Sequence, residues 1–163
     1  TESVSPTPKP KTSNSSPMTN DDKFLFNVSD DVFDRYAKVG FSRLSEPEQV
    51  FICVWSLEGE VNNGGLDQFY FNSSGDHAIA TPDALESIGA SHTAGIVRRA
   101  NAVFGPTGQS PDRSDRQNQL DGLPDSAQAT FNTLDEQFYE YKDNLEELLR
   151  AYVVSHKKEF RKP

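Results

Sequence analysis

Apolar residues recur at helical spacing over most of the chain, and the clearest example lies in its first half. In residues 46–63 (EPEQVFICVWSLEGEVNN), a stripe at about 100° per residue is formed by Val50, Val54, Leu57 and Val61. Ser45 can cap this helix, and Glu48 stands three residues later, which is the spacing of a capping box. The NNGG run at 62–65 then ends the predicted helix, because Asn and Gly enter the left-handed region at low cost.

Shorter helices are predicted on either side. Caps, apolar faces and terminating glycines favour helices over residues 29–40, 66–75, 81–89 and 91–105. Residues 105–126 contain too many Gly and Pro residues for a long element, although 112–120 can form one or two turns.

The C-terminal part carries a second apolar stripe. From Phe131 to Tyr152 its positions alternate at spacings of three and four, with a break expected near Lys142 and a cap at Asp143, backed by Glu146. The stripe suits core packing, with dimerisation as the alternative. The predicted fold class is therefore all-α, a single compact domain of about six or seven helices with a disordered N-terminal tail.

The two ends of the chain differ in composition from its middle. Residues 1–20 are mostly Ser, Thr, Pro and Lys, so they lack the apolar surface that would compensate for ordering, and we expect a disordered tail. Met18, the only methionine, is a candidate native start. The helical domain is expected over residues 21–158, followed by a basic tail over residues 159–163.

The central region is strongly acidic. The chain has a formal net charge of −9, but residues 21–155 hold 23 acidic and 10 basic side chains, a net of −13. Such a domain repels nucleic acid and anionic membranes and favours a basic partner, although acidity can also serve solubility alone. No apolar run reaches the roughly 20 residues that span a bilayer. No secretory signal is recognised and Cys53 is the single cysteine, so we expect a cytoplasmic location.

Several polar residues in the first half are expected to serve structure. Glu58 falls inside the apolar arc, so its carboxylate needs hydrogen bonds from neighbouring backbone or amide groups, or a raised pKa. Glu60 points elsewhere and is expected in solvent. Gln68 and Asn72 stand four residues apart and can bridge neighbouring backbones. The whole polar motif comprises Glu58, Asn62, Asn63, Gly64, Gly65, Gln68, Asn72 and Gly75.

Catalytic and metal-binding patterns are weak. His77, His92 and His156 include no pair at i, i+3 or i+4, which disfavours a metal site, and no cofactor motif is recognised. Ser73 and Ser74 lack a nucleophile elbow. The alternative that stays open is an enzyme or small-ligand site built from Glu58, Gln68, Asn72, Asp76 and His77.

Acidic residues are the stronger functional candidates. Direct nucleic-acid binding is disfavoured, because Arg98, Arg99, Arg113 and Arg116 are too few against the acidic field. Carboxylates lie between the apolar positions of the C-terminal stripe, where most should project into solvent: Asp135, Glu136, Glu140, Asp143, Glu146 and Glu147. Carboxylates spaced along a helix can approximate the spacing of duplex phosphates, and the alternative is an ordinary solvated helix face.

Several stretches resemble a known family. EGEVNNGGLDQFYFNSSGDHA (58–78), then DALESIGASHTAGIVRRANAVF and later LDEQFYEY with LEELLRAYV, resemble a small bacterial helical domain typified by a DNA-mimic protein. The similarity covers roughly residues 28–156. Its most distinctive pieces are VNNGG, the Gln68 and Phe69 pair, NSSGD and the later LD and FY. These residues look like determinants of the fold.

The resemblance implies an all-α fold, a homodimer, and an acidic surface that occupies the DNA-binding face of a transcription regulator. We therefore expect a non-enzymatic, acidic protein-binding module with a basic DNA-binding protein as partner. No cofactor, direct nucleic-acid contact or membrane partner is expected.

Overall fold

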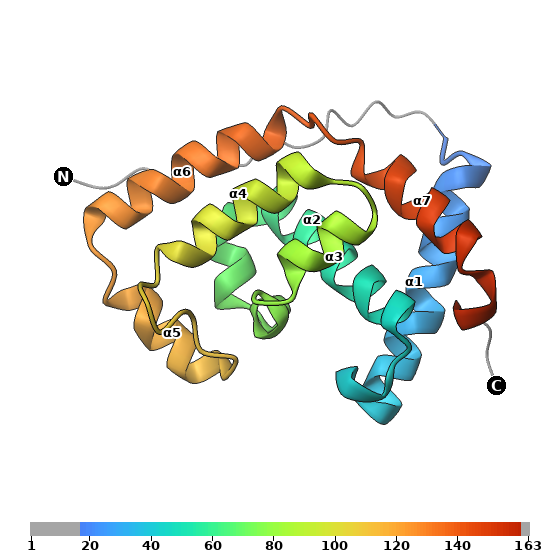
Figure 1. Ribbon diagram of the computed structural model, residues 1–163, viewed down its shortest axis with the longest axis horizontal. Coiled ribbons are helices and arrows are strands. Elements are labelled where there is room, and N and C mark those ends of the chain that lie inside the picture. The colour runs from blue at the N-terminus through green and yellow to red at the C-terminus, as the bar shows by residue number, and fades with distance from the viewer. Residues whose placement is uncertain (1–16, 161–163) are drawn as a thin grey trace.

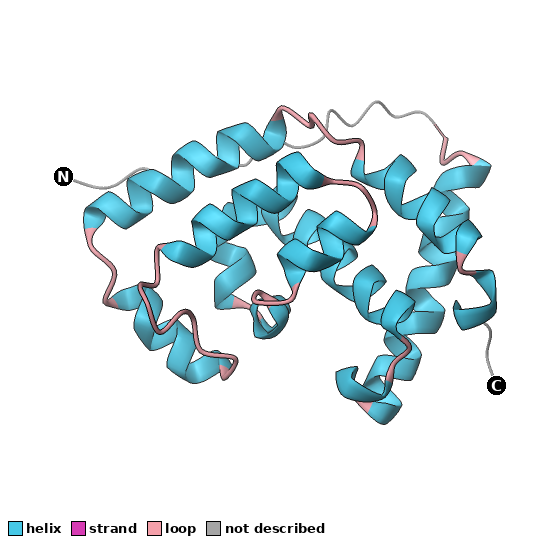
Figure 2. Cartoon of the chain, viewed as in Figure 1, coloured by secondary structure: helices cyan, strands magenta, loops and turns pink. Residues whose placement is uncertain are grey.

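The computed structural model describes residues 17–160 and, over that range, contains helices and loops but no strand (Figure 2). The α-helices are α1 (Asn20–Val39), α2 (Glu46–Phe71), α3 (Thr81–Ser87), α4 (Ser91–Ala102), α5 (Arg113–Asp121), α6 (Asp125–Tyr139) and α7 (Leu145–Ser155). Three short 3-10 turns are η1 (Phe41–Arg43), η2 (Ser73–His77) and η3 (Lys157–Phe160). The predicted all-α fold is confirmed, while most of the predicted N-terminal tail, residues 1–16, lies outside the described residues.

Helix α2 is the centre of the domain. It contacts α1, α3, α5, α6 and α7, whereas α4 packs against α3 and α6 (Figure 1). The predicted stripe is buried, with Val54, Leu57 and Val61 fully inaccessible to solvent. The Ser45–Glu48 capping box is also present at the start of α2. The apolar period therefore located the core correctly, because burying one helix face supplies most of the stabilisation.

Two helix starts differ from the sequence expectation. Helix α1 begins at Asn20, about ten residues earlier than predicted, and Thr19 caps it in a capping box with Asp22. The earlier start buries Leu25 in addition to Val32. Helix α7 is capped by Asn144, whose side chain accepts a hydrogen bond from the Glu147 amide, rather than by Asp143.

The predicted break at NNGG is present, although the helix resumes directly after it. Gly64 and Gly65 leave the helical conformation, and Gly65 has φ +75°, in the region that favours glycine. The chain then continues as the second half of α2 to Phe71. The expected short helix over 66–75 is therefore this half-helix followed by η2.

Candidate functional site

Two side chains of helix α6 form hydrogen bonds with the backbone on either side of the break in α2. The Leu66 amide, left without a helical partner by the break, donates to Asp135 Oδ1 at 2.8 Å. On the other side of the break, the Tyr139 hydroxyl donates to the Val61 carbonyl at 2.7 Å. A Cβ on Gly65 would lie 2.5 Å from Asp135 Oδ2, so this close approach needs glycine. The NNGG run and the LD and FY pairs are thus parts of one structural unit.

The prediction that Asp135 lies on the acidic surface is wrong. Its side chain is 6% exposed and caps the restarted helix instead of facing solvent. Burial raises the pKa of Asp135 to about 7, and the negative charge of Asp67 adds a smaller increase. The hydrogen bond from the Leu66 amide acts in the opposite direction and lowers this pKa. Its position between apolar stripe residues could not reveal this, because the amide that needs it lies 69 residues away in sequence.

The amides of the polar motif bind Glu60. Gln68 Nε2 and Asn72 Nδ2 donate to Glu60 Oε2 at 2.6 and 3.0 Å. Asn63 Nδ2 donates in turn to Gln68 Oε1 at 3.1 Å. Glu60, expected in solvent, is half-buried and is held by these amides. The bend in α2 brings the turn after Gly65 back toward Glu60, which a straight helical projection does not anticipate.

Glu58 is satisfied by a phenol. The buried Glu58 carboxylate accepts a hydrogen bond from the Tyr141 hydroxyl at 3.1 Å. The Tyr141 oxygen in turn accepts a hydrogen bond from Asn62 Nδ2 at 2.6 Å. One donor to Glu58 is therefore a side chain from the α6–α7 connection, whereas the sequence predicted donors from neighbouring backbone or amide groups. Burial, followed by the negative charge of Glu58, raises the pKa of Tyr141.

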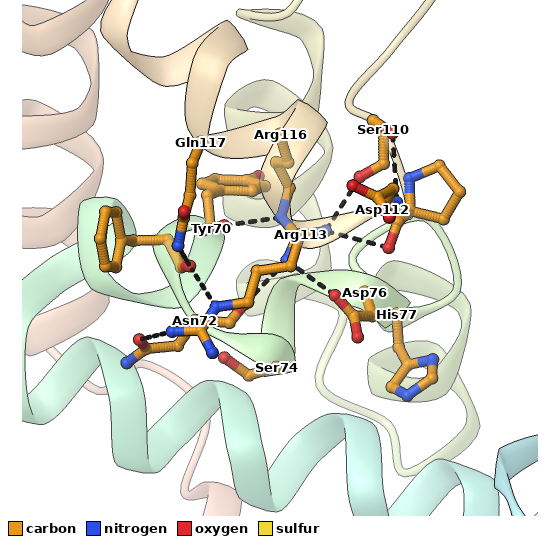
Figure 3. A network of polar contacts seen from close by, with 12 residues as sticks. Tyr70, Asn72, Ser74, Asp76, His77, Ser110, Asp112, Arg113, Arg116 and Gln117 are labelled. Carbon is orange, nitrogen blue, oxygen red and sulfur yellow. Dashed lines mark hydrogen bonds and ion pairs between the residues drawn. The ribbon is translucent and has the colours of Figure 1, made fainter.

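A second network surrounds Arg116, which is fully buried (Figure 3). Its guanidinium donates to the carbonyl oxygens of Tyr70 at 2.6 Å, Asn72 at 2.8 Å and Ser110 at 2.9 Å, and it pairs with Asp76 at 2.8 Å. These bonds join α5 to the end of α2 and to η2.

Gly75 leaves room for this arginine. A Cβ on Gly75 would lie 2.7 Å from Arg116 Nε and 2.8 Å from the Phe69 carbonyl oxygen. In the sequence, Arg116 stands out only as one of the few candidate contacts for nucleic acid, and its structural role was not predicted. The one signal in the sequence is the adjacent Gly75 and Asp76, a small residue beside a carboxylate.

The five residues of the alternative ligand site do not converge. Glu58 binds Tyr141, the two amides bind Glu60, and Asp76 binds Arg116. His77 Nε2 lies 2.9 Å from the Tyr36 hydroxyl, and burial lowers the pKa of the imidazole. A cavity of about 290 Å³ does adjoin part of this region, lined by Phe33, Tyr36, Ile52, Trp55, Ser56, Gly59, Glu60, Ser73, Ser74 and His77.

The single cysteine is buried in the core and is not a reactive group. Burial raises the pKa of Cys53 to about 12, so its thiol is a poor nucleophile near neutral pH. Among residues 17–160, no group of three or more His, Cys, Asp or Glu side chains is arranged to hold a metal ion. None of the described helices has the length and apolar character needed to cross a membrane.

The remaining acidic candidates lie around the connection between α6 and α7, along one edge of the molecule (Figure 1). Glu136, Glu140 and Glu147 are exposed, and Glu146 is half-buried. Asp143 is half-buried and accepts hydrogen bonds from the backbone amide of Thr93 at 2.8 Å and its hydroxyl at 2.9 Å. We call Glu136, Glu140, Glu146 and Glu147 the α6–α7 acidic face.

Fold and site together define an acidic, all-helical domain in which the motif residues hold the bent α2 in place. The model of the DMP19-like protein family matches residues 42–156, and the chain belongs to this family of DNA-mimic proteins. Comparison with curated proteins found no match, nor did comparison with solved structures. The match spans both the α2 break and the α6–α7 acidic face.

Proposed function

We propose that this domain is an acidic protein-binding module that acts as a DNA mimic, occupying the DNA-binding surface of a basic transcription regulator. The observation that carries the proposal is the α6–α7 acidic face, where Glu136, Glu140 and Glu147 are exposed. Membership of a DNA-mimic family supports it. The net charge of −13 over residues 21–155 adds a long-range field that would attract a basic protein.

The family motifs serve the fold, whereas Glu140 and Glu147 make only exposed local contacts, with Lys142 at 3.6 Å and with the side-chain amide of Asn144 at 3.2 Å. Asp135 and Arg116 are buried and occupied within the domain. The exposed glutamates follow one another along the end of α6 and the start of α7, so their charges can stand in for successive phosphates of a DNA strand.

Affinity capture from cells of the source organism tests the proposal. The tagged protein at low salt should retain a DNA-binding protein, and retention should fall by at least about tenfold between 50 and 200 mM salt, because the contact is electrostatic. A duplex carrying the operator of the captured regulator should compete with the domain. Capture without competition by DNA would contradict the mimic role.

Charge reversal locates the binding face. The double variant Glu140→Lys with Glu147→Lys should abolish capture. The control is the double variant Asp115→Lys with Asp121→Lys, which changes the net charge equally at exposed positions on α5. This control should weaken capture far less. Equal losses in the two double variants would show that net charge alone is responsible.

A second candidate function rests on the 290 Å³ cavity, whose wall combines the Glu60 carboxylate, the His77 imidazole and the hydroxyls of Ser73 and Ser74. These groups suit a small polar ligand. Thermal-shift screening of the intact protein against Glu60→Gln tests it: a ligand that stabilises the wild type but not the variant supports this site, and a screen without such a ligand dismisses it.

The homodimer implied by the family is a further proposal. Sedimentation velocity at several concentrations should give twice the chain mass of 18.1 kDa. A constant monomer would exclude it.

A further inference from the structure

The cavity of about 290 Å³ between α1, α2 and η2 carries one negative charge at neutral pH. Its described lining residues include a single carboxylate, that of Glu60, and neither lysine nor arginine. The other titratable groups in this wall are Tyr36 and His77. Burial raises the pKa of the Tyr36 phenol and lowers that of the His77 imidazole, so both are neutral at pH 7. The cavity therefore favours a cation over an anion.

Glu60 keeps one oxygen for a ligand. Gln68 Nε2 and Asn72 Nδ2 both donate to the other oxygen, Oε2, at 2.6 and 3.0 Å. Among the described residues, no side chain donates to Glu60 Oε1 and no basic side chain pairs with this carboxylate, yet Oε1 is not enclosed by the protein. The two amides thus fix the orientation of the carboxylate without neutralising its charge, and a donor in the cavity can bind Oε1.

The serine hydroxyls of the wall add further acceptors. Ser74 Oγ donates its proton to the Phe69 carbonyl oxygen at 3.1 Å, so it can only accept from a ligand. Ser56 and Ser73 line the same cavity, and their hydroxyls make no hydrogen bond within residues 17–160. A ligand group with several N–H donors and no acceptor matches this wall, and a primary ammonium has three such donors.

The rest of the wall is apolar and largely aromatic. Phe33 and Tyr36 of α1 meet edge to face with ring centroids 6.3 Å apart, and α2 contributes Ile52 and Trp55. The Tyr36 hydroxyl lies 2.9 Å from His77 Nε2, which holds the Tyr36 ring in place. The faces of aromatic rings attract cations, and Ile52 offers a contact for an alkyl chain.

We propose that this cavity binds a small primary amine as its alkylammonium ion. The ammonium group donates to Glu60 Oε1 and to a serine hydroxyl, while the alkyl chain packs against Ile52 and the aromatic rings. Ligand cavities range from roughly 300 to 1,000 Å³, so this one suits a short-chain amine. The inference names the ligand class of the second candidate function and rests on that function.

The side-chain amides of Gln68 and Asn72 report on this cavity, because both donate to Glu60. Titration of the intact ¹⁵N-labelled protein with n-butylammonium chloride at pH 7 and constant ionic strength should shift their NMR signals until they saturate. 1-Butanol has the same chain length without the charge and should give no saturable shift. A flat amine titration, or equal responses to the two compounds, would overturn the proposal.

Two charge-neutralising variants separate the cavity from the general acidity of the domain. Glu60→Gln removes the charge but keeps an oxygen for the two amides, so it should weaken amine binding by at least about tenfold. Glu46 begins the same helix, is exposed and does not line the cavity, so Glu46→Gln is the matched control and should leave binding unchanged. Equal losses in the two variants would contradict the assignment.

The aromatic wall is tested separately. Phe33→Leu removes a ring from the cavity and keeps an apolar side chain, so it should weaken amine binding by about threefold or more. Phe24 is also a half-buried residue of α1 packed against the core, but it does not line the cavity, so Phe24→Leu is the control. Binding by Phe33→Leu as tight as that of the wild type would count against the proposed contact.

The thermal-shift screen distinguishes failure of this inference from failure of the second candidate function. A flat amine titration, together with another ligand whose stabilising effect needs Glu60, overturns the inference and leaves that function in place. A flat titration with no such ligand overturns both. The DNA-mimic proposal is independent of either result, because no residue of the α6–α7 acidic face lines this cavity.

Discussion

Asp135 links the stability of the domain to pH, because its pKa of about 7 exceeds the ordinary value of 3.8. Between pH 3.8 and about pH 7, the folded state therefore keeps a proton on Asp135 that the unfolded state has already released. Its contribution to stability is largest below pH 4, declines as the pH rises through 7, and is absent above that range.

Asp135→Asn should remove this dependence. From pH 5 to pH 8, the free energy of unfolding of the wild type should fall by about 2 to 3 kcal/mol more than that of the variant, which keeps an acceptor for Leu66 but cannot ionise. Urea unfolding of both proteins at the two pH values measures the difference. Parallel pH profiles would contradict the assignment.

Arg116 should be the most sensitive charged residue in the fold. Arg116→Met leaves the Asp76 carboxylate unpaired and several carbonyl oxygens without donors, so it should lower the free energy of unfolding by about 3 to 5 kcal/mol. Arg113 lies in the same helix and is exposed, so Arg113→Met should cost less than about 1 kcal/mol. Chemical denaturation compares them, and similar losses would show that burial is unimportant here.

Residue roles were the least predictable part of the molecule. The position of Glu58 in an apolar arc correctly indicated a buried, satisfied carboxylate. Its donor, Tyr141, lies 83 residues away, and local periodicity says only that a buried polar group needs a partner. Asp135 and Arg116 escaped prediction for the same reason.

At the scale of the element, the bend in α2 passes through Gly64 and Gly65, of which Gly65 has the positive φ. Gly65→Ala combines a positive φ with a Cβ 2.5 Å from Asp135 Oδ2, so it should lower stability by about 2 kcal/mol or more. Gly59→Ala lies in the same helix in open space and should raise stability by about 0.5 to 1 kcal/mol. Thermal unfolding should separate the two variants in opposite directions; a shared direction would refute this account.

At this scale, signals that act within a few residues succeeded for α2 and failed for the starts of α1 and α7. The Ser45–Glu48 box and the break at Gly64 and Gly65 were both predicted correctly. The start of α1 was missed because Ser29 and Asp30 also fit a helix cap, so the apolar residues at 24–26 and 28 were left outside the predicted helix. The reciprocal cap of Thr19 and Asp22 is recognisable only once the helix is known to begin there.

At the scale of the whole molecule, the acidic charge opposes folding as well as attracting a partner. Salt screens the repulsion among the carboxylates, so the melting temperature should rise between 10 and 200 mM NaCl. Glu140→Lys with Glu147→Lys should reduce this rise. Calorimetry over the salt series measures it, and a falling melting temperature would contradict it. Salt should therefore strengthen the fold while weakening the proposed complex.

The buried Glu48 has a consequence for how the domain opens. One carboxylate oxygen accepts the Ser45 amide at 3.0 Å and caps α2, while the other pairs with Arg35 of α1 at 3.1 Å. Detaching α1 would remove the Arg35 guanidinium from this carboxylate and leave it with the Ser45 cap alone. Helices α1 and α2 are therefore expected to open together. Their amide hydrogens should exchange as one cooperative unit, and α1 should not exchange separately before α2.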